Sequence, residues 1–74
     1  MSPDEIFKKV GVSNIKEFIE REFRLMNEAR KKGLEFNCFQ DLTSEESDFI
    51  LPYVNEAYEK GIVKNNHLKL NRIN

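Results

Sequence analysis

The segment from Asn14 to Lys32 constrains the fold of this chain more than any other, because its apolar residues repeat with the spacing of an α-helix. Asn14 is a favourable N-cap, Glu17 follows three residues later, and Gly33 supplies a stop. At about 100° per residue, one broad stripe holds Ile15, Phe18, Ile19, Phe23, Leu25, Met26 and Ala29. The stripe spans about 160°, whereas one neighbouring element covers about 100°. This helix must therefore be covered from two sides, or from one side and by a second molecule.

The length of 74 residues indicates a single domain, residues 1–74, with a small core. Cys38 is the only cysteine and His67 the only histidine, so no disulfide can form within the chain and zinc lacks its usual ligands. We therefore predict no metal and no cofactor, and we expect helix packing or a homo-oligomer to supply the stability. The lone thiol favours the cytoplasm, and no apolar stretch is long enough for a membrane span. The sequence predicts a soluble intracellular protein with no membrane partner.

A short helix is predicted near the N-terminus. Ser2 and Glu5 have the spacing of a capping box, and Pro3 suits the first helical position. Gly11 supplies the stop. The apolar side of this helix consists of Ile6, Phe7 and Val10.

A third helix is predicted between Thr43 and Gly61, with Thr43 and Glu46 in a second capping box. Its apolar stripe consists of Phe49, Ile50, Tyr53, Val54, Ala57 and Tyr58. We assign the aromatic members to the core, since aromatic residues at helical spacing are usually buried. Pro52 removes one backbone hydrogen bond, so we expect a kink or a split there. The centres of the core stripes are Phe18, Ile19, Met26, Ile50 and Val54.

The remaining segments carry weaker signals. Residues 34–39 alternate apolar and polar side chains, as in a short strand or an extended connector. Residues 62–70 are compatible with a β-hairpin, and residues 71–74 are expected to fray. The predicted fold is mostly α: a small bundle of about three helices, one short, one long and one kinked at Pro52, with a C-terminal β-hairpin or short strand pair as an option.

Charge is segregated along the chain, although the net charge is only −1. Residues 1–32 sum to +2, residues 33–59 to −7 and residues 60–74 to +4. The candidate partner-binding residues in the acidic stretch are Glu45, Glu46, Asp48, Glu56 and Glu59. One interpretation is a solvated helix face with the basic tail folded against it. The other is the footprint of a partner, and an acidic footprint favours a basic protein.

Glu22 is anomalous because it lies within the apolar face of the second helix. Burying an unpaired carboxylate there would cost several kcal/mol. We expect an ion pair with another element, or displacement of the side chain by local curvature. The partner types that the sequence offers are Lys69, Arg72 and His67. The alternative is that this part of the stripe is left for a partner.

No catalytic constellation stands out in the sequence. Cys38 and His67 are the residue types of a nucleophile–base pair. However, Cys38 alternates with Leu34 and Phe36, which favours a small core residue. The glycines stand at helix ends rather than in a phosphate-binding loop, and the carboxylates lack the loop glycine of a calcium site. An enzyme is therefore the least favoured class, and we predict none.

Two classes of function remain. The first is a non-enzymatic protein-interaction module, a small regulator, inhibitor or adaptor that acts through its surface. The second is a nucleic-acid-binding module of the winged-helix kind, with Lys64, Lys69 and Arg72 as candidate phosphate contacts. Nucleic-acid binders are usually basic, and the third helix carries acids that repel phosphate, so this hypothesis ranks second.

Overall fold

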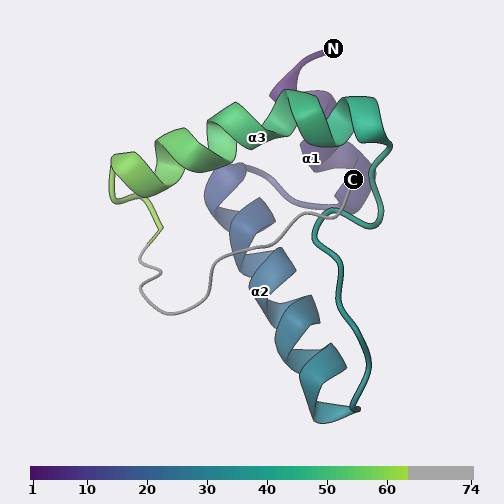
Figure 1. The fold of residues 1–74 in the computed structure, drawn as a ribbon. Helices are drawn as coiled ribbons and strands as arrows, with labels where there is room; N and C mark the ends of the chain where they lie inside the picture. The colour runs from purple at the N-terminus through teal and green to yellow at the C-terminus, as the bar shows by residue number, and fades with distance from the viewer. Residues whose placement is uncertain (64–74) are drawn as a thin grey trace.

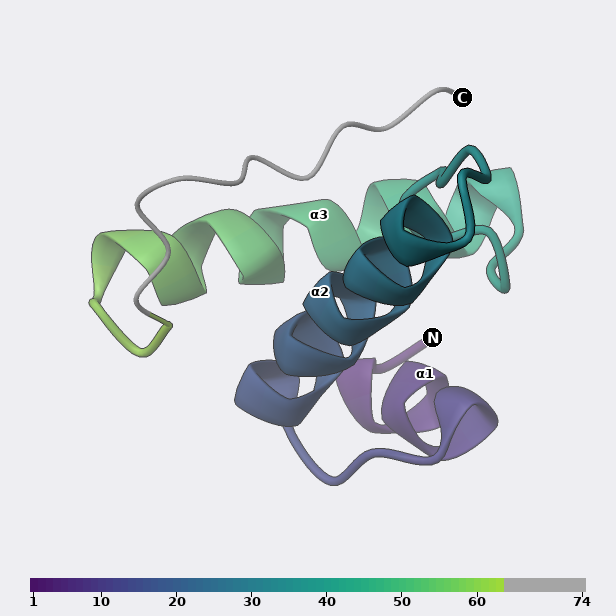
Figure 2. The same ribbon diagram turned by 90° about the horizontal axis from the view of Figure 1, so that it is seen from below.

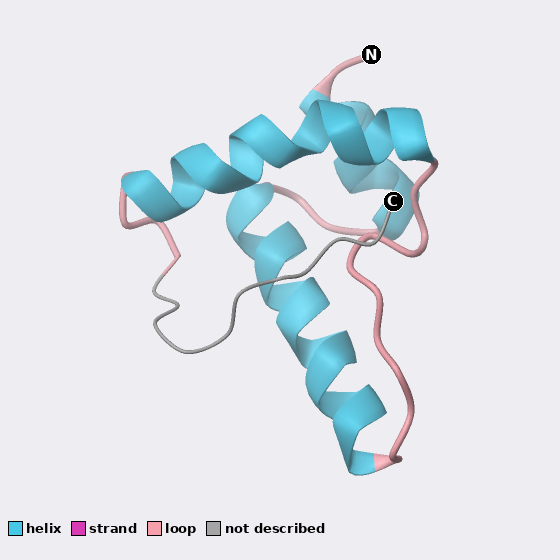
Figure 3. Ribbon diagram, viewed as in Figure 1, coloured by secondary structure: helices cyan, strands magenta, loops and turns pink. Residues whose placement is uncertain are grey.

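The computed structural model of the chain describes residues 1–63, which form three α-helices. Helix α1 spans Pro3–Val10, α2 spans Ile15–Lys31 and α3 spans Ser44–Glu59 (Figure 1). No strand occurs among residues 1–63, so residues 34–39 are a connector and not a strand (Figure 3). The mostly helical, three-helix prediction is confirmed for this part of the chain. The hairpin predicted for residues 62–70 falls outside the described residues, apart from its first two positions.

The three helices meet at one end of α2. Its N-terminal part lies against α1 and α3, whereas its C-terminal end projects away from both (Figures 1 and 2). The connector of residues 32–43 returns along α2 from this projecting end to the start of α3 (Figure 1). Helix α2 is therefore covered on several sides, as the width of its apolar stripe predicts.

The core contains side chains from all three helices and from the connector. Phe18 is fully buried at its centre, where its ring centroid lies 6.1 Å from that of Phe7 and 5.6 Å from that of Phe39. The five residues predicted at the stripe centres are all buried: Phe18, Ile19, Met26, Ile50 and Val54. Cys38 is buried as well, which confirms its assignment as a small core residue.

Local capping explains where α2 and α3 begin. Asn14 Oδ1 accepts a hydrogen bond from the Glu17 N–H at 2.9 Å. Thr43 Oγ1 accepts from the Glu46 N–H at 3.1 Å, and Glu46 Oε1 accepts from the Thr43 N–H at 2.9 Å, which completes the predicted capping box. Two of the three predicted side-chain caps are thus confirmed.

The capping box predicted for α1 is wrong. Ser2 is the N-cap, but its side chain makes no capping hydrogen bond. Its carbonyl accepts instead from the Glu5 N–H at 3.2 Å, an i→i−3 bond of the kind that tightens a helix end. At the other end, Gly11 takes φ +81°, the left-handed conformation expected of a glycine stop.

Helix α3 continues through Pro52 without interruption. Proline lacks the N–H that would bond the carbonyl of Asp48, yet the helix does not end there. The split into two helices is therefore wrong, and the kink stays a prediction. Pro52 lies on the exposed side of α3, opposite Ile50 and Val54.

Candidate functional site

The acidic face of α3, which we define as Glu45, Asp48, Glu56 and Glu59, is the most distinctive surface of the described chain. These residues and Pro52 follow one another at intervals of three and four, so they share one side of the helix. All of them are exposed, whereas Ile50, Val54 and Ala57 on the opposite side are buried. Helix α3 carries no basic residue in its last turn or elsewhere between Ser44 and Glu59. Four of the five predicted partner-binding acids therefore lie along one exposed side of α3, in two pairs separated by Pro52.

Glu46, the fifth predicted acid, is engaged within the chain. Its Oε1 lies 2.6 Å from Lys9 Nζ, which ties the start of α3 to α1. The hydrogen bond from Lys9 is the main reason why the pKa of Glu46 lies below its ordinary value of 4.5, with a further contribution from the Thr43 N–H. Because it already serves as a cap and an ion-pair partner, we leave Glu46 out of the acidic face.

A hollow of about 520 Å³ opens beside the acidic face. It is lined by Asp48, Phe49, Pro52, Tyr53 and Glu56. The ring centroids of Phe49 and Tyr53 lie 5.5 Å apart at an interplanar angle of 44°. Tyr53 is 39% exposed, which corrects its assignment to the core, and Phe49 is half-buried. The hollow thus combines aromatic surface with two carboxylates.

The sequence could not identify this hollow. The apolar stripe of α3 includes Phe49 and Tyr53, and a stripe does not say which of its edges a neighbouring element covers. Only the packing of α1 and α2 against the other edge leaves Tyr53 outside. At about 100° per residue, the stripe of α3 from Phe49 to Tyr58 is wider than the arc that a single neighbour covers, which is the one signal in the sequence that part of it lies outside the core.

Glu56 also interacts with Lys60, one turn further along the chain. Glu56 Oε1 lies 2.5 Å from Lys60 Nζ, and the hydrogen bond with Glu56 raises the pKa of Lys60. Both side chains are more than half exposed, at 53% and 62%. An exposed pair of this kind contributes little to stability, so a competing cation can open it at small cost.

Glu22 has a structural partner that the sequence did not predict. It is 1% exposed, and its Oε1 accepts a hydrogen bond from the Phe39 N–H at 2.7 Å. Arg21 Nη1 lies 3.7 Å from Glu22 Oε2, while Arg21 Nη2 donates to Asp41 Oδ2 at 2.6 Å. The carboxylate thus fixes the connector to α2. The charged partners that the sequence offers, Lys69, Arg72 and His67, lie outside the described residues, so an ion pair with one of them stays a prediction. Within residues 1–63, the positive charge beside this carboxylate is that of neighbouring Arg21.

Burial raises the pKa of Glu22 above its ordinary value of 4.5. The Phe39 N–H and the charge of Arg21 act in the opposite direction, and Asp41 adds to the increase. Phe39 itself takes φ +59°, a conformation that is uncommon for a residue with a side chain. The hydrogen bond to Glu22 and the stacking on Phe18 hold it there. We therefore interpret Glu22 as an anchor for the connector rather than as a binding residue.

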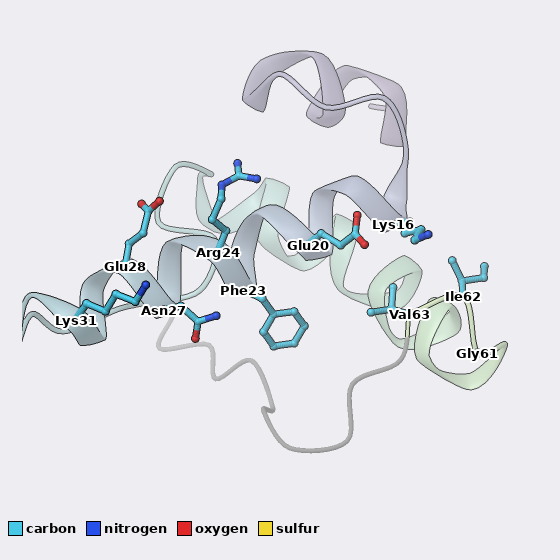
Figure 4. A pocket seen from close by; sticks show the side chains of 10 residues that line it. All are labelled: Lys16, Glu20, Phe23, Arg24, Asn27, Glu28, Lys31, Gly61, Ile62 and Val63. Atoms are coloured by element: carbon cyan, nitrogen blue, oxygen red, sulfur yellow. The ribbon is translucent and has the colours of Figure 1, made fainter.

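A second depression, of about 720 Å³, lies between the exposed side of α2 and the turn that follows α3 (Figure 4). Phe23 forms its apolar part together with Ile62 and Val63. Its charged residues alternate in sign along α2: Lys16, Glu20, Arg24, Glu28 and Lys31. Such mixed charge selects no ligand class, so we assign this depression no role.

Several other residues that the sequence analysis names are not described by the structure. Lys64, Lys69 and Arg72, the candidate phosphate contacts, lie outside the described residues, as does His67. Within residues 1–63, no group of three or more His, Cys, Asp or Glu side chains is placed to hold a metal ion. None of the helices in this range has the length and apolar character needed to cross a bilayer.

Comparison of the chain with protein family models, with curated proteins and with solved structures finds no match.

Proposed function

We propose that this protein is a non-enzymatic interaction module, a small regulator, inhibitor or adaptor, that binds a basic segment of another protein through the acidic face of α3. The single observation that supports this proposal is the placement of Glu45, Asp48, Glu56 and Glu59 on one exposed side of a helix with no basic residue between Ser44 and Glu59.

The arrangement is electrostatically unfavourable for the isolated chain. Glu45 and Asp48 are three residues apart, and so are Glu56 and Glu59, and like charges at this spacing destabilise a helix by a few tenths of a kcal/mol per pair. Lys60 offsets part of this repulsion at Glu56. A basic partner relieves this repulsion when it binds. The negative electrostatic potential of the acidic face also attracts a basic segment before contact and thereby accelerates association.

Nucleic acid is the less favoured partner because the acidic face repels phosphate. In a winged-helix arrangement α3 would have to approach the phosphate backbone, where its exposed carboxylates oppose binding. Lys64, Lys69 and Arg72 are the residues that would have to overcome this repulsion. A nuclease-sensitive, salt-sensitive affinity for duplex DNA or RNA would favour this second function.

The proposal predicts that removing the acidic face weakens binding to a basic peptide. The face variant replaces the four acids of the acidic face with their amides: Glu45→Gln, Asp48→Asn, Glu56→Gln and Glu59→Gln. A matched control replaces four exposed acids elsewhere in the chain: Asp4→Asn, Glu5→Gln, Glu20→Gln and Glu28→Gln. The probe is a fluorescently labelled Gly/Ser peptide with equal numbers of lysine and arginine. Since exposed charge pairs contribute about 0.2–1 kcal/mol each, we expect the loss of four such pairs to lower the affinity of the face variant about fourfold or more.

The control variant separates a specific face from a general charge effect. Both variants lose four negative charges, so an equal loss of affinity in the two would contradict the proposal. A wild-type chain that does not bind the peptide at low salt would contradict it as well. Fluorescence anisotropy at several salt concentrations measures the affinities, and circular dichroism checks that both variants fold.

A further inference from the structure

We infer that the hollow lined by Asp48, Phe49, Pro52, Tyr53 and Glu56 seats an arginine side chain of the basic partner. This inference rests on the proposed function and specifies the chemistry that the acidic face recognises. It follows from two features of the hollow, its aromatic pair and its flanking carboxylates.

The aromatic pair favours a planar cation. Phe49 and Tyr53 lie 5.5 Å apart and are tilted by 44°, and Tyr53 is 39% exposed. Aromatic ring faces carry partial negative charge and attract cations. A guanidinium group is planar and weakly hydrated, so it stacks on a ring more readily than a lysine ammonium, which holds its water.

The carboxylates favour a group with several donors. Asp48 and Glu56 line the hollow on either side of Tyr53 along the helix, and both are exposed. A guanidinium has five N–H donors and no acceptor, so it can donate to a carboxylate while its face lies on an aromatic ring. These carboxylates repel an anionic side chain, and a purely apolar side chain has no donor to offer them, so neither fits the hollow as well as a guanidinium.

Lys60 competes for one of the two carboxylates. Its Nζ lies 2.5 Å from Glu56 Oε1, so an arginine that enters the hollow must share or displace this contact. Removing the competing ammonium therefore strengthens arginine binding. The variant Lys60→Gln should bind an arginine peptide about two- to fivefold more tightly than Lys8→Gln, an exposed control in α1 with the same change of charge.

The central test compares three Gly/Ser peptides that differ only in carrying arginine, lysine or the neutral arginine isostere citrulline. We expect the wild-type chain to bind the arginine peptide about two- to fivefold more tightly than the lysine peptide and to bind the citrulline peptide least, given the strength of an exposed cation–π contact. Tyr53→Leu keeps an apolar side chain but removes the ring, so it should abolish the preference for arginine and weaken binding of the lysine peptide less than binding of the arginine peptide. Phe23→Leu, in the second depression, should keep the preference.

The outcomes separate this inference from the proposed function. If the wild-type chain binds neither basic peptide, both fail. If it binds arginine and lysine equally, or if Tyr53→Leu keeps the arginine preference, the inference is overturned while the proposed function stands. A preference that Tyr53→Leu removes and Phe23→Leu retains supports it. Because Tyr53 is partly exposed, its replacement leaves the core intact, and thermal melting verifies the fold.

Discussion

Replacing Ile19 with alanine is expected to remove much of the stability of this protein. Ile19 is fully buried in α2, within the cluster that joins all three helices. Truncating a buried isoleucine to alanine costs about 2–5 kcal/mol, because apolar contacts are lost and a cavity remains. Domains of this size are stable by only about 0.05–0.15 kcal/mol per residue. A large fraction of the Ile19→Ala chains should therefore be unfolded at 37 °C.

Thermal and urea denaturation followed by circular dichroism measure this effect. For a domain of this length each kcal/mol lowers Tm by about 4–8 °C. Leu34→Ala is the matched control, since Leu34 is 61% exposed and its truncation should change stability by less than about 0.5 kcal/mol. If the Ile19→Ala variant melts at the same temperature as the wild type, Ile19 does not belong to the core.

Replacing Glu22 with alanine should produce the second-largest loss. The change removes the acceptor of the Phe39 N–H and leaves this buried donor without its partner, which costs about 1–3 kcal/mol before any cavity is counted. Glu22→Gln keeps an acceptor oxygen and removes the buried charge, although its amide nitrogen comes close to Arg21. We therefore expect Glu22→Gln to be clearly more stable than Glu22→Ala. Equal losses in the two variants would contradict the role of the Phe39 hydrogen bond.

Because Glu22 titrates, its contribution to the free energy of unfolding depends on pH, and the sign of this dependence follows from the direction of its pKa shift. Its pKa is raised in the folded chain, so the folded state binds the proton more tightly than the unfolded state, whose value is near 4.5. The resulting stabilisation is fully present below pH 4.5 and is lost as the pH rises through the folded value. Relative to Glu22→Gln, the wild type should therefore gain stability as the pH falls from 7 towards 4.5.

Urea unfolding at a series of pH values tests this difference. Glu46 behaves in the opposite way, because its lowered pKa provides stability that is lost on acidification. That loss is common to the wild type and to Glu22→Gln, so it cancels in the comparison. If the unfolding free energy of the wild type, relative to that of Glu22→Gln, stays constant or falls on acidification, burial does not control the titration of Glu22.

The helices were predictable because their signals are local. The stop at Gly11 and the caps at Asn14 and Thr43 depend on residues within one turn, and the structure confirms them. The failure at Ser2 is also local, since the side chain and the carbonyl of the same residue compete for the first free N–H groups and the carbonyl takes that of Glu5. The residue types alone do not predict which of these two acceptors forms the hydrogen bond.

The connector and the hollow were not predictable because they depend on contacts between distant residues. The position of Glu22 in an apolar stripe indicates that its carboxylate needs a partner. It does not identify that partner as the N–H of Phe39, seventeen residues away. Phe39, which makes this contact, also has a positive φ that its residue type does not predict. Similarly, the acidic face could be read from the spacing of its residues, whereas the exposure of Tyr53 depends on where α1 and α2 pack.

The central claim is that the acidic face of α3 is the binding surface, and NMR chemical-shift mapping tests it most directly. A ¹⁵N-labelled full chain, with its tyrosine rings also labelled, is titrated with the unlabelled arginine peptide. We expect the largest shift changes at the exposed positions of α3 and at the ring of Tyr53, and we expect them to disappear at high salt. The chemical shifts of the charged residues that line the second depression, from Lys16 to Lys31, should change little. Shift changes centred on that depression, or on residues 64–74, or an absence of changes at α3, would contradict the claim.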